Sequence, residues 1–107
     1  MAQDVHPEIR TERGEKVPTD PVRRAAFGTL VARILGSVDL TAFPLLSGID
    51  PYGNTVFNCV QLPRVVLELR RLAWSLPDGV RVGVDDLADF VSQYADDSRL
   101  YLWFIGD

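Results

Sequence analysis

Residues 50–76 read DPYGNTVFNCVQLPRVVLELRRLAWSL, a turn followed by an amphipathic helix. Pro51 fixes one backbone dihedral angle and Gly53 permits a positive one, so residues 50–54 are typical of a chain reversal. A polar residue at position 54 or 55 can cap the helix that follows. This helix organises the predicted fold, because its apolar residues need a core to pack against.

We expect the helix to begin at Val56 or Leu62 and to end near Leu76. Its main apolar face follows helical spacing and consists of Leu62, Val65, Val66, Leu69, Leu72, Ala73 and Leu76. A second apolar row recurs every seven residues on the opposite side and consists of Val60, Leu67 and Trp74, beside Arg64, Arg70 and Arg71. We favour a helix that the chain itself covers on both sides. The alternative is an exposed contact surface of the Trp and Arg type.

Further helices are predicted on either side of this one. Asp20-Pro21 is typical of a helix start, and apolar residues recur at helical spacing as far as Leu35. A third helix is expected to open at Asp85 or Asp86, and a short fourth one falls within residues 39–49. The sequence thus predicts three or four helices.

A small antiparallel β element completes the prediction. Residues 100–105 are aromatic and apolar, which indicates a buried strand. Its partner is either residues 80–84, which alternate in polarity, or the N-terminal arm of residues 1–19, which is extended or mobile. The expected fold class is mostly α (α+β), with residues 20–107 forming a single helical domain.

Composition argues against several classes of function. The chain has 107 residues and a net charge of -4, which disfavours nucleic acid as a partner. His6 and Cys59 are the only histidine and cysteine, too few for a zinc site or a histidine-assisted nucleophile. We therefore expect no enzyme activity, cofactor or metal. With no membrane span or secretion signal in the sequence, we expect a cytoplasmic location.

Acidic side chains gather towards the C-terminus. The candidate partner-binding residues are Asp85, Asp86, Asp89, Asp96 and Asp97. Such a surface can steer the approach of a basic partner protein, although a solvated helix face has the same composition. The alternative partner-binding set consists of Leu67, Arg70, Arg71 and Trp74.

Two segments carry a resemblance to a known group of proteins. Residues 50–58, DPYGNTVFN, and the ending LWFIGD at residues 102–107 resemble small uncharacterised actinobacterial proteins in which a YGxTxFN turn precedes a helix. The similarity covers residues 49–107. It implies a bacterial, cytosolic origin and brings no activity with it.

Three functional hypotheses follow. The first is a small acidic module that neutralises or regulates a partner protein, in the manner of immunity proteins that bind toxins. The second is a structural or self-assembling module, a homo-oligomer that uses the row containing Trp74. The third is a small-ligand binder or enzyme built on residues 50–58. We favour the first, because size, negative charge and the aspartates agree with it.

Overall fold

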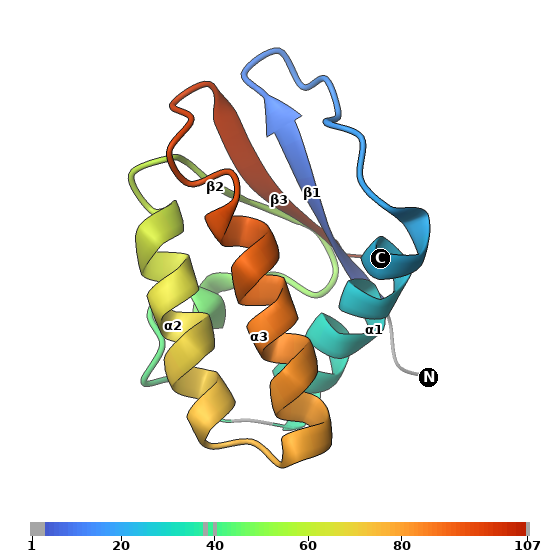
Figure 1. Cartoon of the computed structure of the whole chain (residues 1–107), viewed down its shortest axis with the longest axis vertical. Helices are drawn as coiled ribbons and strands as arrows, with labels where there is room; N and C mark the ends of the chain where they lie inside the picture. The colour runs from blue at the N-terminus through green and yellow to red at the C-terminus, as the bar shows by residue number, and fades with distance from the viewer. Residues whose placement is uncertain (1–3, 38, 40, 107) are drawn as a thin grey trace.

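A three-stranded antiparallel sheet forms one layer of this α+β fold, and helices pack against it (Figure 1). The computed structural model describes residues 4–37, 39 and 41–106. Within them the elements are, in chain order, β1 (Val5–Thr11), α1 (Pro21–Ser37), the 3₁₀ helix η1 (Leu46–Gly48), β2 (Asn54–Phe57), α2 (Leu62–Trp74), α3 (Asp78–Ser92) and β3 (Leu100–Gly106). Figure 1 shows α2 and α3 side by side in front of the sheet, with α1 beside β1.

The C-terminal strand β3 is the centre of the sheet, whose strand order is β1-β3-β2. Leu102 of β3 lies opposite Ile9 of β1 and Phe57 of β2, and all three are buried on the face that the helices cover. The pairing with β1 confirms the N-terminal arm as a partner of the C-terminal strand. The second partner, β2, was predicted as part of a turn and helix start, and that prediction is wrong.

Residues 80–84 are helical, so their prediction as a strand is also wrong. Helix α3 begins at Asp78 rather than at Asp85 or Asp86. Val84, Leu87 and Val91 of this helix are buried, whereas Val82 is exposed. The alternating pattern is therefore one turn of an amphipathic helix, in which burial against the core outweighs the low helix propensity of the glycines at positions 79 and 83.

Helix α2 begins at Leu62, the later of its two predicted starts, and Asn58 rather than residue 54 or 55 caps the turn before it. The Asn58 Oδ1 accepts hydrogen bonds from the Val60 and Gln61 backbone N–H groups. In return the Gln61 Oε1 accepts a bond from the Asn58 backbone N–H at 2.9 Å. This reciprocal pair is a capping box, which satisfies donors that a helix start leaves free.

The helix predicted within residues 39–49 reduces to the 3₁₀ turn η1, and a buried carboxylate holds it in place. Glu68 of α2 is only 2% exposed. Its two carboxylate oxygens accept hydrogen bonds from the backbone N–H groups of Leu45 and Leu46 at 3.0–3.1 Å. The carboxylate thus supplies acceptors that the chain before η1 lacks, and it ties that loop to α2.

Helix α1 follows the predicted start at Asp20-Pro21, where the Asp20 Oδ1 accepts a bond from the Val22 backbone N–H. Its buried residues Phe27, Val31 and Ile34 complete the core. None of the helices in the described ranges has the length and apolar character required to cross a membrane.

Candidate functional site

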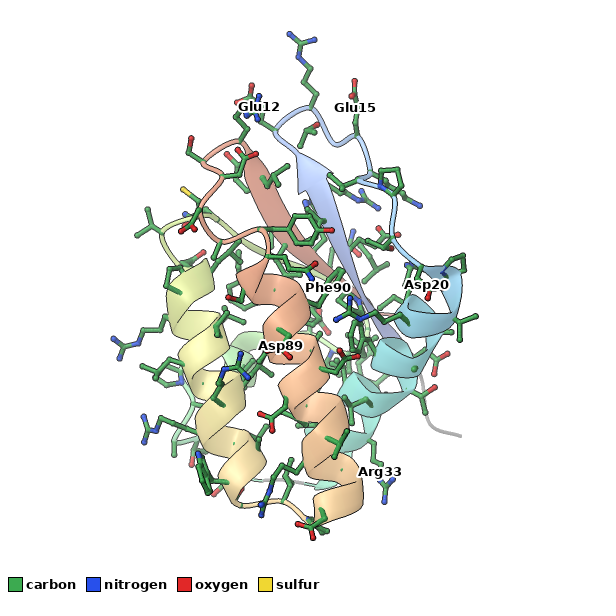
Figure 2. The ribbon with its side chains drawn as sticks, in the orientation of Figure 1. Glu12, Glu15, Asp20, Arg33, Asp89 and Phe90 are labelled. Atoms are coloured by element: carbon green, nitrogen blue, oxygen red, sulfur yellow. The ribbon has the colours of Figure 1, made fainter. Side chains whose placement is uncertain are left out.

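Two of the candidate aspartates face α2 and share one arginine. Arg70 of α2 lies 2.6 Å from the Asp89 carboxylate and 3.6 Å from that of Asp85. The hydrogen bond to Asp89, followed by the charges of Asp89 and Asp85, raises the pKa of the Arg70 guanidinium above its ordinary value. Asp89 therefore lies on the α2 side of α3 (Figure 2) and is partly neutralised.

The remaining aspartates point elsewhere. Asp86 pairs with Arg23 of α1 at 2.8 Å, on the other flank of α3. Asp97 pairs with Arg99 at 3.1 Å, and the hydrogen bonds from Arg99 lower the pKa of the Asp97 carboxyl. Asp96 is exposed in the turn after α3, because the helix ends at Ser92. The five aspartates thus meet three arginines, so their net charge is -2, and they do not form one continuous face.

The row formed by Val60, Leu67 and Trp74, here called the α2 strip, is exposed. Their exposed fractions are 82%, 54% and 79%. We favoured a strip covered within the chain, and that prediction is wrong for the described residues. The physical reason is that α2 packs against α3 and η1 through one face, where Leu62, Leu69 and Leu72 are buried, and no described element covers the opposite side.

Arginines border the α2 strip on both sides. Helical geometry places Arg64 and Arg71 on the flank away from α3, where the Arg71 guanidinium lies 5.9 Å from the Phe43 ring centre. On the flank towards α3 lies Arg70 with its two aspartates. The only acidic residue of α2 is Glu68, which is turned inward. One flank is therefore cationic and the other carries a net charge of -1.

Trp74 is held at the end of the strip by a neighbouring arginine. The Arg81 guanidinium of α3 lies 5.8 Å from the centre of the Trp74 ring. Arg81 also donates hydrogen bonds to the backbone oxygens of Ala73 and Leu76, at 3.1 Å and 3.2 Å. These bonds satisfy carbonyls at the end of α2 and fix the guanidinium beside the indole ring.

The turn at residues 50–58 is engaged in backbone bonds. The Asp50 Oδ1 accepts a bond from the Tyr52 backbone N–H, and the Thr55 hydroxyl accepts one from the Asp50 N–H. Asn58 caps the turn before α2, as described above. Among residues 4–37, 39 and 41–106, no group of three or more His, Cys, Asp or Glu is arranged to hold a metal ion.

One cluster of charged side chains was missed by sequence reasoning. Glu8 of β1 is buried and contacts Arg10 at 2.6 Å, Arg24 at 2.8 Å and Lys16 at 3.2 Å. Burial raises the pKa of the Glu8 carboxyl, but the hydrogen bonds from Arg10 and Lys16 and the charges of Arg10 and Arg24 outweigh it and lower the pKa. The sequence carries no signal for this cluster, since its members share neither a helix face nor a motif.

Comparisons with protein-family models, with curated proteins and with solved structures yield no match to this chain. Its function is therefore inferred from the side chains described above.

Proposed function

We propose that this chain is a small protein-binding module that neutralises or regulates a partner protein, and that it contacts the partner through the α2 strip. One observation carries the proposal: Leu67 and Trp74 are exposed on α2, Val60 is exposed in the turn before it, and arginines border them. Single exposed apolar residues are ordinary on a protein surface. An aligned set that includes Trp and Arg is typical of the residues that dominate binding energy.

Of the three residues in the α2 strip, Trp74 offers the largest apolar area for a partner to bury. A tryptophan side chain presents up to about 250 Å², and Trp74 is 79% exposed, so roughly 200 Å² is available for contact. Its burial contributes about 5 kcal/mol at about 25 cal/mol per Å², before the costs of association are subtracted. Leu67 and Val60 extend this contact along the helix, as one side of a groove-bound helix does.

The charges beside the strip define the partner's complementary surface. Arg64 and Arg71 favour an acidic rim on the partner, because opposite charges across an interface favour correct docking. On the other flank, Asp85 and Asp89 exceed the single charge of Arg70 and favour a basic residue opposite them. We infer a partner with an apolar groove, acidic along one edge.

The test begins with purified products of the neighbouring genes, measured for binding by calorimetry and for loss of their own activity. Trp74→Ala is expected to weaken the complex by about 2 kcal/mol or more, which is about 30-fold in Kd. Leu67→Asp is expected to abolish binding. Val22→Asp is the matched control, since Val22 is 78% exposed on α1, outside the strip. A complex that both strip variants leave unchanged would refute the proposal.

The aspartates at positions 85, 86, 89, 96 and 97 are the alternative contact surface, which would suit a basic partner. In that case the double reversal of Asp96 and Asp97 to lysine slows association, and slows it much more at low salt than at high salt. Equal slowing at both salt concentrations would show that these charges do not steer the approach.

A second copy of the chain is the alternative partner for the strip, and the opposite charges of the two flanks favour it. A two-fold axis parallel to α2 would place the Arg64 and Arg71 flank of one copy against the Asp85 and Asp89 flank of the other. Light scattering distinguishes the two functions. A dimer that Leu67→Asp dissociates supports self-assembly, whereas a monomer at high concentration excludes it.

A further inference from the structure

A cavity of about 180 Å³ lies between α1, α3 and the chain that precedes α1. Residues 18–20 form one wall, and Pro7 of β1 contributes to the lining. The aromatic lining comes from Phe27 on α1, from Phe90 on α3 and from Tyr94 in the turn after α3. Figure 2 labels two of the lining residues, Asp20 in the chain before α1 and Phe90 on α3. None of these residues belongs to the α2 strip.

Aromatic rings form the apolar part of the cavity. The ring centres of Phe27 and Phe90 are 5.3 Å apart, and those of Phe90 and Tyr94 are 5.5 Å apart in an edge-to-face arrangement. Such rings favour another planar ring, which can add to the same tilted packing. The size agrees, because a dry protein cavity of about 150 Å³ holds one benzene molecule. A monocyclic ring with one small substituent therefore fits.

Two arginines form the polar part of the lining. Arg23 uses Nε and Nη2 to bind Asp86, and Arg24 uses Nη2 to bind Glu8. Among the described residues, no group accepts a hydrogen bond from Nη1 of Arg23 or from Nη1 of Arg24. Carboxylates are the preferred partners of guanidinium groups, because both of their oxygens accept charge-assisted bonds.

Asp86 and Glu8 each offset part of the charge of one arginine, but neither lines the cavity, whose lining carries more positive than negative charge. Asp20 is the one acidic residue of the lining, and its Oδ1 is directed at the Val22 backbone N–H. The lining thus holds two cationic side chains and one anionic side chain. The Arg23 guanidinium also lies 5.3 Å and 5.4 Å from the Phe27 and Phe90 ring centres, so charge and aromatic surface adjoin.

We propose that this cavity binds a small monocyclic aromatic carboxylate, with the ring on Phe27, Phe90 and Tyr94 and the carboxylate on Arg23 and Arg24. The ligand is a free small molecule, and the site is independent of the partner that the α2 strip binds. The probe is benzoate, titrated into the full chain labelled with ¹⁵N. We expect a Kd of about 1 mM or tighter, with shifts concentrated at residues 18–27 and 90–94.

Two comparisons test whether the arginines of the cavity bind the carboxylate: one changes the ligand and the other changes the protein. Benzamide, which keeps the ring and loses the charge, is expected to bind about tenfold more weakly or worse. Arg24→Gln is expected to weaken benzoate binding by a similar factor, whereas Arg64→Gln, an exposed arginine on α2, leaves it unchanged. Equal affinity for benzamide and benzoate would overturn the proposal, as would the absence of shifts at the lining residues at millimolar benzoate.

Arg24→Gln also removes the Arg24–Glu8 ion pair, which contributes to folding. A second variant therefore tests the site with this ion pair intact. Thr19→Trp fills the cavity from its wall and leaves both arginines and their partners in place. If the folded variant, judged from its amide spectrum, no longer binds benzoate, the cavity is the site. If it binds benzoate as tightly as the original chain, the site lies elsewhere and the proposal is wrong.

Discussion

Replacing Gly28 with alanine tests the contact between α1 and β1. A Cβ atom at position 28 would lie 2.5 Å from Cε1 and 3.2 Å from Cγ of the His6 imidazole, and closer still to Nδ1. The ring would have to move. Alanine in a helix interior is favoured over glycine by about 1 kcal/mol, whereas overpacking costs about 1–3 kcal/mol. We expect Gly28→Ala to destabilise the chain by about 1 kcal/mol, the difference between the two effects.

Removing the His6 imidazole should reverse the sign of the stability change that Gly28→Ala causes. His6 Nδ1 is buried and, in the described part of the chain, has no hydrogen-bond partner. His6 Nε2 lies 3.7 Å from the Asp4 carboxylate, which water can reach, so His6→Ala leaves no buried group without a partner. In the His6→Ala background the new methyl group meets no ring. Gly28→Ala should then stabilise by up to about 1 kcal/mol through helix propensity. The double-mutant cycle thus predicts a coupling of about 1–3 kcal/mol.

The assay is urea unfolding of the four variants, followed by far-ultraviolet circular dichroism. Gly36→Ala is the matched control, because Gly36 lies in the same helix and a Cβ there meets no atom within 4 Å. It should not destabilise in either background. A change on Gly28→Ala that is equal with and without the imidazole, to within about 0.5 kcal/mol, would refute the reasoning.

Three further predictions concern Glu68, Gly106 and Glu8 and use the same assay. Glu68→Ala should destabilise by about 3 kcal/mol, because the N–H groups of Leu45 and Leu46 lose their acceptor. Gly106→Ala should destabilise by about 3 kcal/mol, because its Cβ would meet backbone, 2.5 Å from the Pro51 carbonyl carbon. Glu8 has a lowered pKa in the folded state, so its contribution is present above about pH 4.3 and is lost as pH falls through the folded value. Glu8→Gln should therefore flatten the loss of stability in acid.

Each of these three predictions has a matched variant or measurement for comparison. Glu68→Gln keeps one oxygen, and Oε1 alone reaches both N–H groups in the present geometry, so it should cost less than alanine. Gly48→Ala, where a Cβ meets nothing within 4 Å, is the control for Gly106. If Glu8→Gln and the original chain lose stability in parallel between neutral and acid pH, the three cations around Glu8 do not stabilise its charged form.

Periodicity in the sequence was enough to predict α1 and the core face of α2. The arm was one of the two partners predicted for the C-terminal strand, and periodicity did not choose between them. It failed where a short segment suited two structures. Residues 54–57 precede the capping box of Asn58 and Gln61, so a four-residue strand beside a turn was taken for the helix start. Val80, Val82 and Val84 alternate like a strand, yet two of them also fit a helix stripe with Leu87. Tertiary packing decides between such patterns, and the sequence does not reveal it.

The arrangement of the candidate surfaces could not be predicted for a different reason. The residues of both sets were present in the sequence, but their partners were not evident. Arg23 and Asp86 are 63 residues apart, and Arg70 and Asp89 are 19 apart. An ion pair of that separation needs the tertiary arrangement before it can be predicted. The row of Val60, Leu67 and Trp74 had the correct spacing, while its burial depended on whether the chain had a second layer to cover it.

Charge distribution connects the fold to the proposed interface. The chain carries a net charge of -4, yet α2 turns its one acidic residue, Glu68, inward to hold the loop before η1. The outer side of α2 is left with arginines and apolar residues only. A structural requirement of the core therefore produces a cationic, apolar surface on an acidic protein. Arginines also lie on α1, whose residues include no Asp or Glu. A partner with an acidic rim is therefore oriented on α2 by the exposed apolar strip beside the arginines, and not by charge alone.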